Sequence, residues 1–502
     1  MTARNAIKEK TDRAELRKAQ LDMIWLLLGK LPLFLRLIFS RLFGMSEISR
    51  YMDMSTEIHL AVLRLTLGTP TGRSISDIQA LTLLDPGVKG RVWVSNAVAE
   101  VPPQRGLREA LYDAIVSLGK LSPRRAKHVK IPAIVPVEAE WTGYRAGVSK
   151  DAPQPHLPEV MKYEAMMKEC RNDTTVMFFH GGSFFLFDPS TYRKITRRLA
   201  KVTGGRVYSV RYRLAPQHPF PAALLDALVS YFTLLYPPPG SMHEAVPAKN
   251  IIFSGDNAGG NLALALTQTL MHLRRQSRRM TWYGAKRVVP LPAGITLLSP
   301  SLDIAQSMPS WSTNQKWDYL PDPELRHTRP EPARDQLWPA TPRRRYIYVE
   351  DPLLLHPLAS VHMSRSWAGC PPVWISCGWE CHADENKYLV ARMLADHVPV
   401  VFEEYEAMPH AFAVMMPRLA ESARCVQGWA RFIAAARKDP AGIVSSYTQI
   451  KAKTLEEVEG NPETLTPYGQ KEILELARAR IGKRMSALST LSGLSANTNP
   501  RL

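Results

Sequence analysis

The chain has 502 residues, of which 45% are hydrophobic and 22% are charged. This composition is typical of a globular protein with a sizeable core, and it excludes a wholly disordered chain, a collagen and a coiled coil. Lysine and arginine total 64 against 46 aspartate and glutamate residues, which gives a formal charge of +18. Such a charge suits contact with an anionic membrane surface or with nucleic acid, and alone it identifies neither partner.

The most apolar stretch lies near the N-terminus, at residues 21–43 (LDMIWLLLGKLPLFLRLIFSRLF), behind a polar leader of mixed charge. Its 23 residues are long enough to cross a bilayer, but Lys30, Pro32 and Arg36 interrupt it. Apolar residues interleaved with cations favour a segment that lies in the membrane interface, with a spanning helix or a soluble cap helix as alternatives. We therefore expect residues 1–45 to form a basic leader and a membrane-interface segment. An intracellular protein that associates with a membrane through residues 21–43 is the favoured interpretation.

The cysteines are sparse and odd in number, which argues against a disulfide scaffold and favours a reducing compartment. They are Cys170, Cys370, Cys377, Cys381 and Cys425. Cys377 and Cys381 stand close to His382, but no second pair of ligands follows at zinc-finger spacing. We therefore expect neither a metal site nor any other cofactor.

The rest of the chain divides into three parts. Residues 46–137 have helical and then irregular patterns, and are predicted to form a cap or lid. Residues 138–437 alternate short β-rich runs with helical patterns, which predicts an α/β fold with a mainly parallel central sheet flanked by helices. The predicted strands are Thr175–Phe179, Arg206–Val210, Asn250–Phe253, Gly294–Leu298, Val373–Ser376 and Val400–Glu404. Residues 438–502 are polar and are expected to hold one helix, from about Thr466, and a flexible tail from Ser486 to Leu502.

Two glycine-containing motifs follow predicted strands. His180-Gly181-Gly182-Ser183 directly follows an apolar run, and its glycines let backbone N–H groups turn toward a developing oxyanion. Residues 255–261 (GDNAGGN) stand between a strand and a helical run, which is the setting of a nucleophile elbow. Where the elbow needs serine, the chain has Asn257, whose delocalised amide nitrogen cannot be activated by a histidine. An acyl-enzyme at this position is therefore not expected.

A candidate base and two candidate acids follow later strands. His410 stands on a loop beyond the strand Val400–Glu404, and Glu380 and Asp384 follow the strand Val373–Ser376. Carboxyl ends of neighbouring parallel strands meet at one edge of a sheet, so a carboxylate there can orient the histidine. This is the base half of a Ser-His-acid arrangement.

Together these motifs resemble the hormone-sensitive-lipase-like family of α/β-hydrolases, also called the α/β-hydrolase fold-3 family. Further matches are residues 212–216 (YRLAP) and 218–223 (HPFPAA), and the resemblance covers roughly residues 138–437. The N-terminal leader and the segment 299–321 look most similar to fungal members. The resemblance implies an α/β-hydrolase fold with an N-terminal helical cap, and ester hydrolysis of the carboxyl or acetyl ester type.

The resemblance also implies roles for single residues. The oxyanion donors fall on Gly181, Gly182 and the N–H of Ala258, with His180, Gly255, Asp256 and Gly259 as supporting motif positions. The nucleophile position falls on Asn257 and the base on His410. The acid usually lies about thirty residues before the histidine, which selects Glu380, and Asp384 is the alternative.

Two functions from different classes follow. The first is an ester hydrolase that acts on a small acyl ester or a lipid-like substrate near a membrane surface, with activity impaired or altered by Asn257. Whether Asn257 is natural or engineered stays open. The second is a catalytically inactive pseudo-hydrolase that binds a small ligand or a biosynthetic intermediate.

Ser183, Ser254 and Cys381 are expected to be structural rather than substitute nucleophiles. A nucleic-acid partner is not expected, because the basic runs lack a recognisable binding module.

Overall fold

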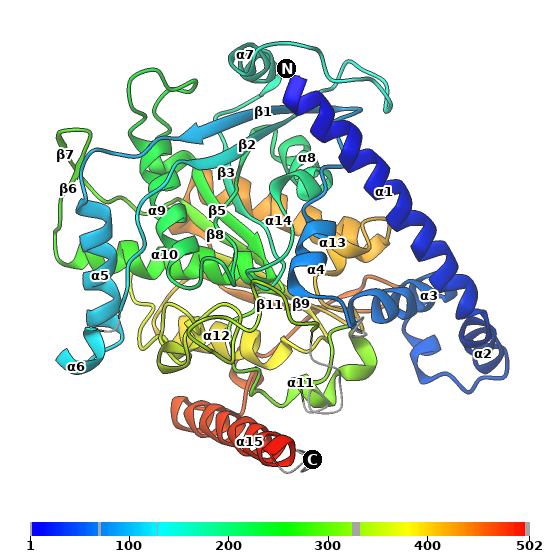
Figure 1. The fold of residues 1–502 in the computed structure, drawn as a ribbon. Coiled ribbons are helices and arrows are strands. Elements are labelled where there is room, and N and C mark those ends of the chain that lie inside the picture. The colour runs from blue at the N-terminus through cyan, green and yellow to red at the C-terminus, as the bar shows by residue number, and fades with distance from the viewer. Residues whose placement is uncertain (1–2, 69–71, 128, 324–331, 497–502) are drawn as a thin grey trace, which may run out of the picture.

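The computed structural model describes residues 3–68, 72–127, 129–323 and 332–496. Its central element is a ten-stranded sheet with the order β1-β2-β4-β3-β5-β8-β9-β10-β11-β12 (Figure 1). The strands of this sheet are β1 (Val92–Ala99), β2 (Val137–Tyr144), β3 (Thr175–Phe179), β4 (Arg206–Val210), β5 (Ile251–Asp256), β8 (Gly294–Leu298), β9 (Val373–Gly378), β10 (Val400–Tyr405), β11 (Ser446–Ile450) and β12 (Glu457–Glu459). A separate hairpin joins β6 (Met280–Trp282) to β7 (Ala285–Arg287).

The sheet is mainly parallel, as the sequence predicted. All neighbouring strands from β4 to β11 pair in parallel, for example Phe178 with Ser254 and Leu298 with Ser376. Antiparallel pairing is confined to β1 and β2 at one edge and to β12 at the other. The carboxyl ends of β3, β5, β8, β9 and β10 therefore meet along one edge.

The sheet extends beyond both ends of the segment 138–437 that was predicted to hold it. Strand β1 lies inside the predicted cap segment 46–137, and β11 and β12 lie inside the predicted tail 438–502. Strands β11 and β12 are short and carry polar residues, whereas β1 has eight mostly apolar residues inside a segment that was predicted to form the cap. The last six residues of the predicted flexible tail, 497–502, lie outside the described residues.

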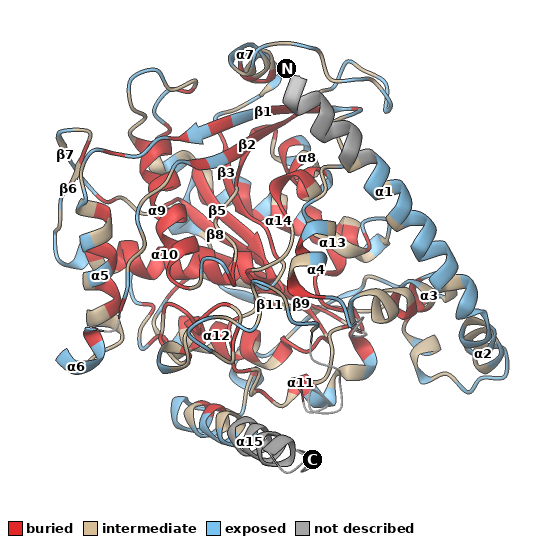
Figure 2. Cartoon of the chain, viewed as in Figure 1, coloured by how far each residue is buried: buried red, intermediate tan, exposed pale blue. Residues whose placement is uncertain are grey.

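Helices cover both faces of the sheet. On one face lie α8 (Arg193–Thr203) and α14 (Ala420–Lys438), and on the other lie α9 (Ala222–Leu235), α10 (Asn257–Arg275) and α12 (Ala383–Ala395). Strand β3 shows the division, because Val176 and Phe178 belong to the core against α8 and α14, whereas Met177 and Phe179 belong to the other core. Burial on both faces explains why the strands read as continuous apolar runs. Figure 2 shows the buried centre of the molecule.

The remaining helices lie at the periphery. They are α1 (Ala3–Gly29), α2 (Leu31–Leu42), α3 (Met54–Leu63), α4 (Ile75–Thr82), α5 (Gly106–Leu118), α6 (Pro123–Ala126), α7 (Glu159–Glu169), α11 (Ser310–Thr313), α13 (Phe412–Met415) and α15 (Gln470–Ala496). N-terminal helices are present, as expected, and α3 packs through Leu60 against Trp317 and Tyr319. The predicted C-terminal helix corresponds to α15.

Helix α1 runs along one side of the molecule to α2, and most of the described length of both helices is exposed (Figure 1 and Figure 2). Their exposed residues include apolar ones, for example Trp25 (72% exposed) and Leu42 (74% exposed). Among the described residues, no single helix combines the length and the apolar character that crossing a bilayer requires. The helical segments Ala14–Gly29 and Leu31–Leu42 meet both requirements only as a pair, which is bent by 56°.

A buried ion pair ties the loop after β4 to α9. The guanidinium of Arg213 donates to both carboxylate oxygens of Asp226, at 2.7 and 3.0 Å, and the Arg213 backbone N–H donates to the same carboxylate at 2.8 Å. Asp226 is buried, so its charge depends on this partner. The arginine of the YRLAP motif therefore has a structural role in this protein.

We predict that Arg213→Ala lowers the free energy of unfolding by about 3–5 kcal/mol, because it leaves a buried carboxylate without its cation. The matched control is Lys316→Ala, which breaks a 2.7 Å pair with Glu47 whose two side chains are largely exposed. That change should cost less than about 1 kcal/mol. Chemical denaturation measures both, and equal small effects would contradict the importance of the buried pair.

Candidate active site

The turn from β5 into α10 forms a tight elbow. Gly259 packs directly on β3, and a Cβ atom at this position would overlap the Phe179 carbonyl oxygen. Asn257 stands at the tip with a positive φ of 48°, the left-handed conformation of a nucleophile elbow. The predicted strand–turn–helix setting is therefore present, and it presents the Asn257 side chain beyond the carboxyl end of β5.

The Asn257 amide contacts two groups of the site at once. Its Nδ2 donates to His410 Nε2 at 2.9 Å, and its Oδ1 accepts a hydrogen bond from the Ser183 backbone N–H at 2.9 Å. Asn257 is only 6% exposed and His410 only 3%. The side chain at the nucleophile position thus joins the histidine to the loop that follows β3.

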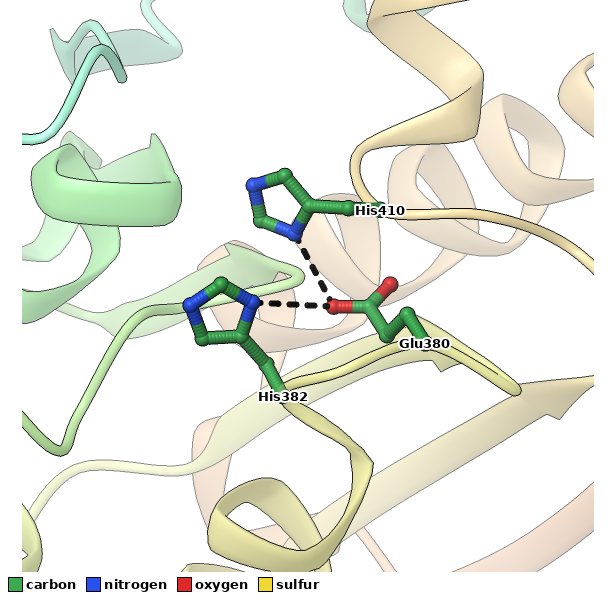
Figure 3. Close-up of side chains that lie close together, drawn as sticks. All are labelled: Glu380, His382 and His410. Carbon is green, nitrogen blue, oxygen red and sulfur yellow. Dashed lines mark hydrogen bonds and ion pairs between the residues drawn. The ribbon is translucent and has the colours of Figure 1, made fainter. Parts of the chain in front are cut away.

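His410 is oriented by Glu380, which follows β9 (Figure 3). Its Nδ1–H donates to Glu380 Oε1 at 3.1 Å. The second carboxylate oxygen, Oε2, accepts from Ser299 Oγ at 2.6 Å and from the Gly378 N–H at 3.2 Å. Glu380 is fully buried, so these bonds fix the carboxylate in place.

The alternative acid, Asp384, does not contact His410. It lies in the first turn of α12, where its carboxylate accepts from the Ser310 backbone N–H at 2.9 Å. The structure therefore brings together Asn257, His410 and Glu380, and leaves Asp384 outside this group.

Nearby carboxylates stabilise the imidazolium that His410 forms when it takes a proton. Burial on its own lowers the pKa of His410, but the Glu380 carboxylate, followed by Asp318 and Asp256, raises this pKa above its ordinary value. Asp318 also accepts the His410 backbone N–H at 3.2 Å. The imidazole is thus equipped to take a proton, and Glu380 would stabilise the imidazolium that forms.

Gly181 does not have the role predicted for it. Its N–H is already bonded, at 3.0 Å to Asp256 Oδ1 and at 3.1 Å to Tyr192 Oη. Tyr192 in turn donates to Asp256 Oδ2 at 2.9 Å. Burial raises the pKa of Asp256 to about 6. An N–H held by a buried carboxyl group is turned away from the reacting centre, which contradicts the predicted oxyanion role of Gly181.

Ser183 is the donor that sequence analysis missed. The positive φ of Gly182 (101°) and of Ser183 (53°) reverses the loop, so that the Ser183 N–H faces Asn257. For Gly182 N–H and Ala258 N–H we find no hydrogen-bond acceptor within the described part of the chain. These three N–H groups are the candidates for an oxyanion hole, and two of them coincide with predicted donors.

His180 supports the loop from behind. Its ring stacks on Tyr212 with centroids 4.3 Å apart, and burial lowers its pKa to about 4. The Tyr212 hydroxyl donates to the His180 carbonyl at 2.7 Å. His180 is therefore a neutral structural residue that shapes the turn before Gly181 and Gly182.

A second histidine lies beside the Glu380–His410 pair. His382 Nδ1 is 3.8 Å from Glu380 Oε1, an ion-pair distance that is too long for a hydrogen bond, and this nitrogen has no hydrogen-bond partner among the described residues (Figure 3). The other ring nitrogen, Nε2, is 3.8 Å from Glu385 Oε1. Burial and the neighbouring His410 lower the pKa of His382 well below its usual value. Ligand atoms of Glu380, His382 and His410 lie within 4.8 Å of one another, a separation that a metal ion could bridge. To do so, His410 would have to give up its Nδ1–H bond to Glu380, so we assign no metal here.

The other side chains considered as nucleophiles do not contact His410 in the described structure. Ser254 lies within β5 and accepts from Thr296 Oγ1 at 2.8 Å. Burial, together with Asp318, raises the pKa of the Cys381 thiol, which opposes thiolate formation. All five cysteines are free thiols.

Comparisons with known proteins identify the family of the chain. A family model described as alpha/beta hydrolase fold matches residues 176–414. The chain is 30% identical over 256 residues to an acetyl-hydrolase from Streptomyces hygroscopicus, and the match covers 50% of this chain and 73% of that protein. It is 26% identical over 252 residues to neutral cholesterol ester hydrolase 1 from Mus musculus, with 50% and 56% of the two chains covered.

A similar fold occurs in the crystal structure of an esterase from the bacterial hormone-sensitive lipase family. That structure superposes with a TM-score of 0.53 at 21% identity, and the match covers 77% of this chain and 99% of the other. At this identity the likeness concerns the fold. It shows that the described sheet and its covering helices form a known arrangement.

We predict that Glu380→Gln lowers the pKa of His410 below its ordinary value, because it removes the charge that outweighs burial. The matched control is Asp384→Asn, which removes a nearby carboxylate that does not contact the imidazole. Its effect on the His410 pKa should be small. NMR titration of labelled histidine side chains measures both, and a larger shift in the Asp384 variant would reverse the assignment of the acid.

Proposed function

The chain belongs to the α/β-hydrolase fold family and is of the esterase and acetyl-hydrolase type, and from this premise we propose that its elbow site receives an ester and hydrolyses it only slowly. The observation that carries this proposal is the pair of bonds made by Asn257. Its Nδ2 is hydrogen-bonded to His410, the histidine that would activate a nucleophile. Its Oδ1 is hydrogen-bonded to the Ser183 N–H, which would otherwise bind an oxyanion.

The residual reaction uses water in place of a side-chain nucleophile. His410 Nε2 takes a proton from water, the water oxygen attacks the ester carbonyl carbon, and Glu380 stabilises the imidazolium. The Gly182, Ser183 and Ala258 N–H groups receive the oxyanion. The ester must first displace Asn257 Oδ1 from Ser183. Enzymes that have lost their nucleophile retain about 10³–10⁴-fold acceleration over water, which sets the scale of the activity expected here.

The same bonds support a second function, that of an inactive pseudo-hydrolase. An amide donates through nitrogen and accepts through oxygen, so Asn257 can pair with a carbonyl or hydroxyl group of a bound ligand. In this role His410 and Glu380 orient Asn257 and transfer no proton. The two functions share one site and differ in whether water is activated.

The substrate class follows from the relatives. The bacterial relative is named an acetyl-hydrolase and the mammalian one a cholesterol ester hydrolase, so we propose a small acyl ester or a lipid-like ester as substrate.

We also propose that α1 and α2 bind a membrane surface. Exposed apolar side chains continue along both helices, among them Trp25, Leu35 and Phe39. Exposed cations such as Lys30 and Arg36 stand among them. Apolar residues with interspersed cations are suited to the boundary of an anionic bilayer, where the apolar groups are buried and the cations contact headgroups.

We predict that Asn257→Ser raises the hydrolysis rate of short p-nitrophenyl esters by about 10²-fold or more, because a hydroxyl beside His410 allows an acyl-enzyme. The variant should also gain covalent labelling by a fluorophosphonate, measured by intact mass. The control is Asn257→Ala, which removes the amide without supplying a hydroxyl and should not label. If Asn257→Ser neither labels nor gains rate, the pocket is not an ester hydrolase site.

The gain in Asn257→Ser should depend on pH in a defined direction. Only the neutral imidazole accepts a proton, and the pKa of His410 is raised, so activity should increase as pH rises through that pKa. A rate–pH profile measures this. A profile that falls over the same range would contradict the role of His410 as base.

We predict that the double variant Leu35→Glu, Phe39→Glu abolishes flotation of the full chain with phosphatidylserine-containing vesicles, because it places carboxylates on the apolar surface of α2. Binding of the unchanged chain should weaken with added salt. The matched control is Val444→Glu, at a valine that is 82% exposed far from α2 in the sequence. Equal flotation of the double variant and the control would contradict the membrane proposal.

A further inference from the structure

Asn257 is itself a carboxylic amide, and its side chain lies between the base and an oxyanion donor of the site. Its Cγ is a carbonyl carbon, its Oδ1 accepts from the Ser183 N–H at 2.9 Å, and its Nδ2 is 2.9 Å from His410 Nε2. An oxyanion donor therefore faces the carbonyl oxygen, and the base faces the nitrogen that would leave. These are two of the three groups that hydrolysis of an amide requires, and the third is a water molecule that attacks Cγ.

The histidine has the tautomer that such a reaction needs. Its Nδ1–H donates to Glu380 Oε1 at 3.1 Å, so Nε2 is unprotonated and can accept a proton from water once its hydrogen bond from Asn257 Nδ2 is broken. After accepting one, Nε2–H stands next to Asn257 Nδ2 and can protonate it as it leaves. Glu380 is fully buried, and it stabilises the His410 imidazolium between the two proton transfers.

We propose that this site hydrolyses its own side chain and converts Asn257 to aspartate. Water gives a proton to His410 Nε2 while its oxygen bonds to Cγ, and the C=O electron pair moves to Oδ1, which is held by the Ser183 N–H. The imidazolium then gives its proton to Nδ2, the Cγ–Nδ2 bond breaks, and ammonia leaves. Water is the only co-reactant, and the products are a carboxyl group and ammonia. The inference rests on the proposed acid–base roles of His410 and Glu380.

The product distinguishes this reaction from ordinary deamidation. The ordinary route closes a ring between Cγ and the backbone nitrogen of Ala258, and the ring opens to a mixture of aspartate and isoaspartate. Ala258 is buried in the first turn of α10, where its backbone is held by the helix. Direct attack by water gives aspartate alone and places one solvent oxygen in its carboxylate.

The conversion would change what the elbow can do. A carboxylate is one of the side-chain nucleophiles that form covalent ester intermediates, whereas an amide is not. A negative charge beside His410 would also stabilise its protonated form. The conversion would thus supply the elbow with a side-chain nucleophile that the amide does not provide.

Peptide mapping by mass spectrometry tests the inference on the full-length protein. Purified protein is incubated near neutral pH in heavy-oxygen water, and the peptide containing Asn257 is followed over time. Asn261, one helical turn further along α10, is the internal control, because its amide donates to the carbonyls of Ser301 and Ala359 and contacts no histidine. His410→Gln and Glu380→Gln are the test variants, with melting temperatures recorded to show that each is folded.

The expected result is conversion of Asn257, but not Asn261, to aspartate that carries one heavy oxygen, with a rate at least about 10²-fold lower in His410→Gln. Conversion should accelerate as pH rises through the pKa of His410. An Asn257 amide that persists as long as that of Asn261 in the unchanged protein overturns the inference, as does isoaspartate. If Asn257→Ser gains esterase activity while unchanged Asn257 keeps its amide, the proposed function stands and this inference alone fails.

Discussion

The whole site depends on one close approach, that of Gly259 to the carbonyl oxygen of Phe179. Because no Cβ atom fits there, the first turn of α10 can lie directly on β3, and the chain must turn sharply between β5 and α10. The sharp turn holds residue 257 in the left-handed conformation and directs its side chain out of the sheet edge. His410, Glu380 and Ser183 come from loops after β10, β9 and β3, and they meet at this one side chain because parallel strands end together.

The site keeps the geometry of a nucleophile elbow and changes the chemistry of one group. A hydroxyl at position 257 could lose its proton to His410, but the amide of Asn257 can only donate to His410 Nε2 and accept from the Ser183 N–H. Both bonds satisfy buried polar groups that would otherwise lack a hydrogen-bond partner. The amide therefore stabilises the same site whose acyl transfer it prevents. Deeper in the fold, Asp256 and Glu380 are each held by two or more donors, which keeps the surrounding loops in place.

Sequence pattern alone predicted the inner strands and the elbow, because each depends on local pattern. The choice of Glu380 over Asp384 came from the spacing that the family resemblance implies. Sequence analysis did not predict β11, whose polar sequence gains its pairing from β10, or β1, whose apolar run was assigned to the cap although it pairs with β2. It also assigned Gly181 rather than Ser183 to the oxyanion hole. The direction of a backbone N–H depends on loop dihedrals, here the positive φ of Gly182 and Ser183, and on the buried Tyr192–Asp256 pair, which no motif reveals.

The central claim is that the Asn257 amide occupies the base of an otherwise intact hydrolase site. The most direct measurement is NMR of protein labelled with nitrogen-15 in histidine and asparagine side chains, above the pKa of His410. We expect an unprotonated His410 Nε2 with a coupling across the hydrogen bond to Asn257 Nδ2, and we expect this coupling to be lost in Asn257→Ala. A His410 whose Nε2 resonance is the same in the unchanged protein and in Asn257→Ala would contradict it.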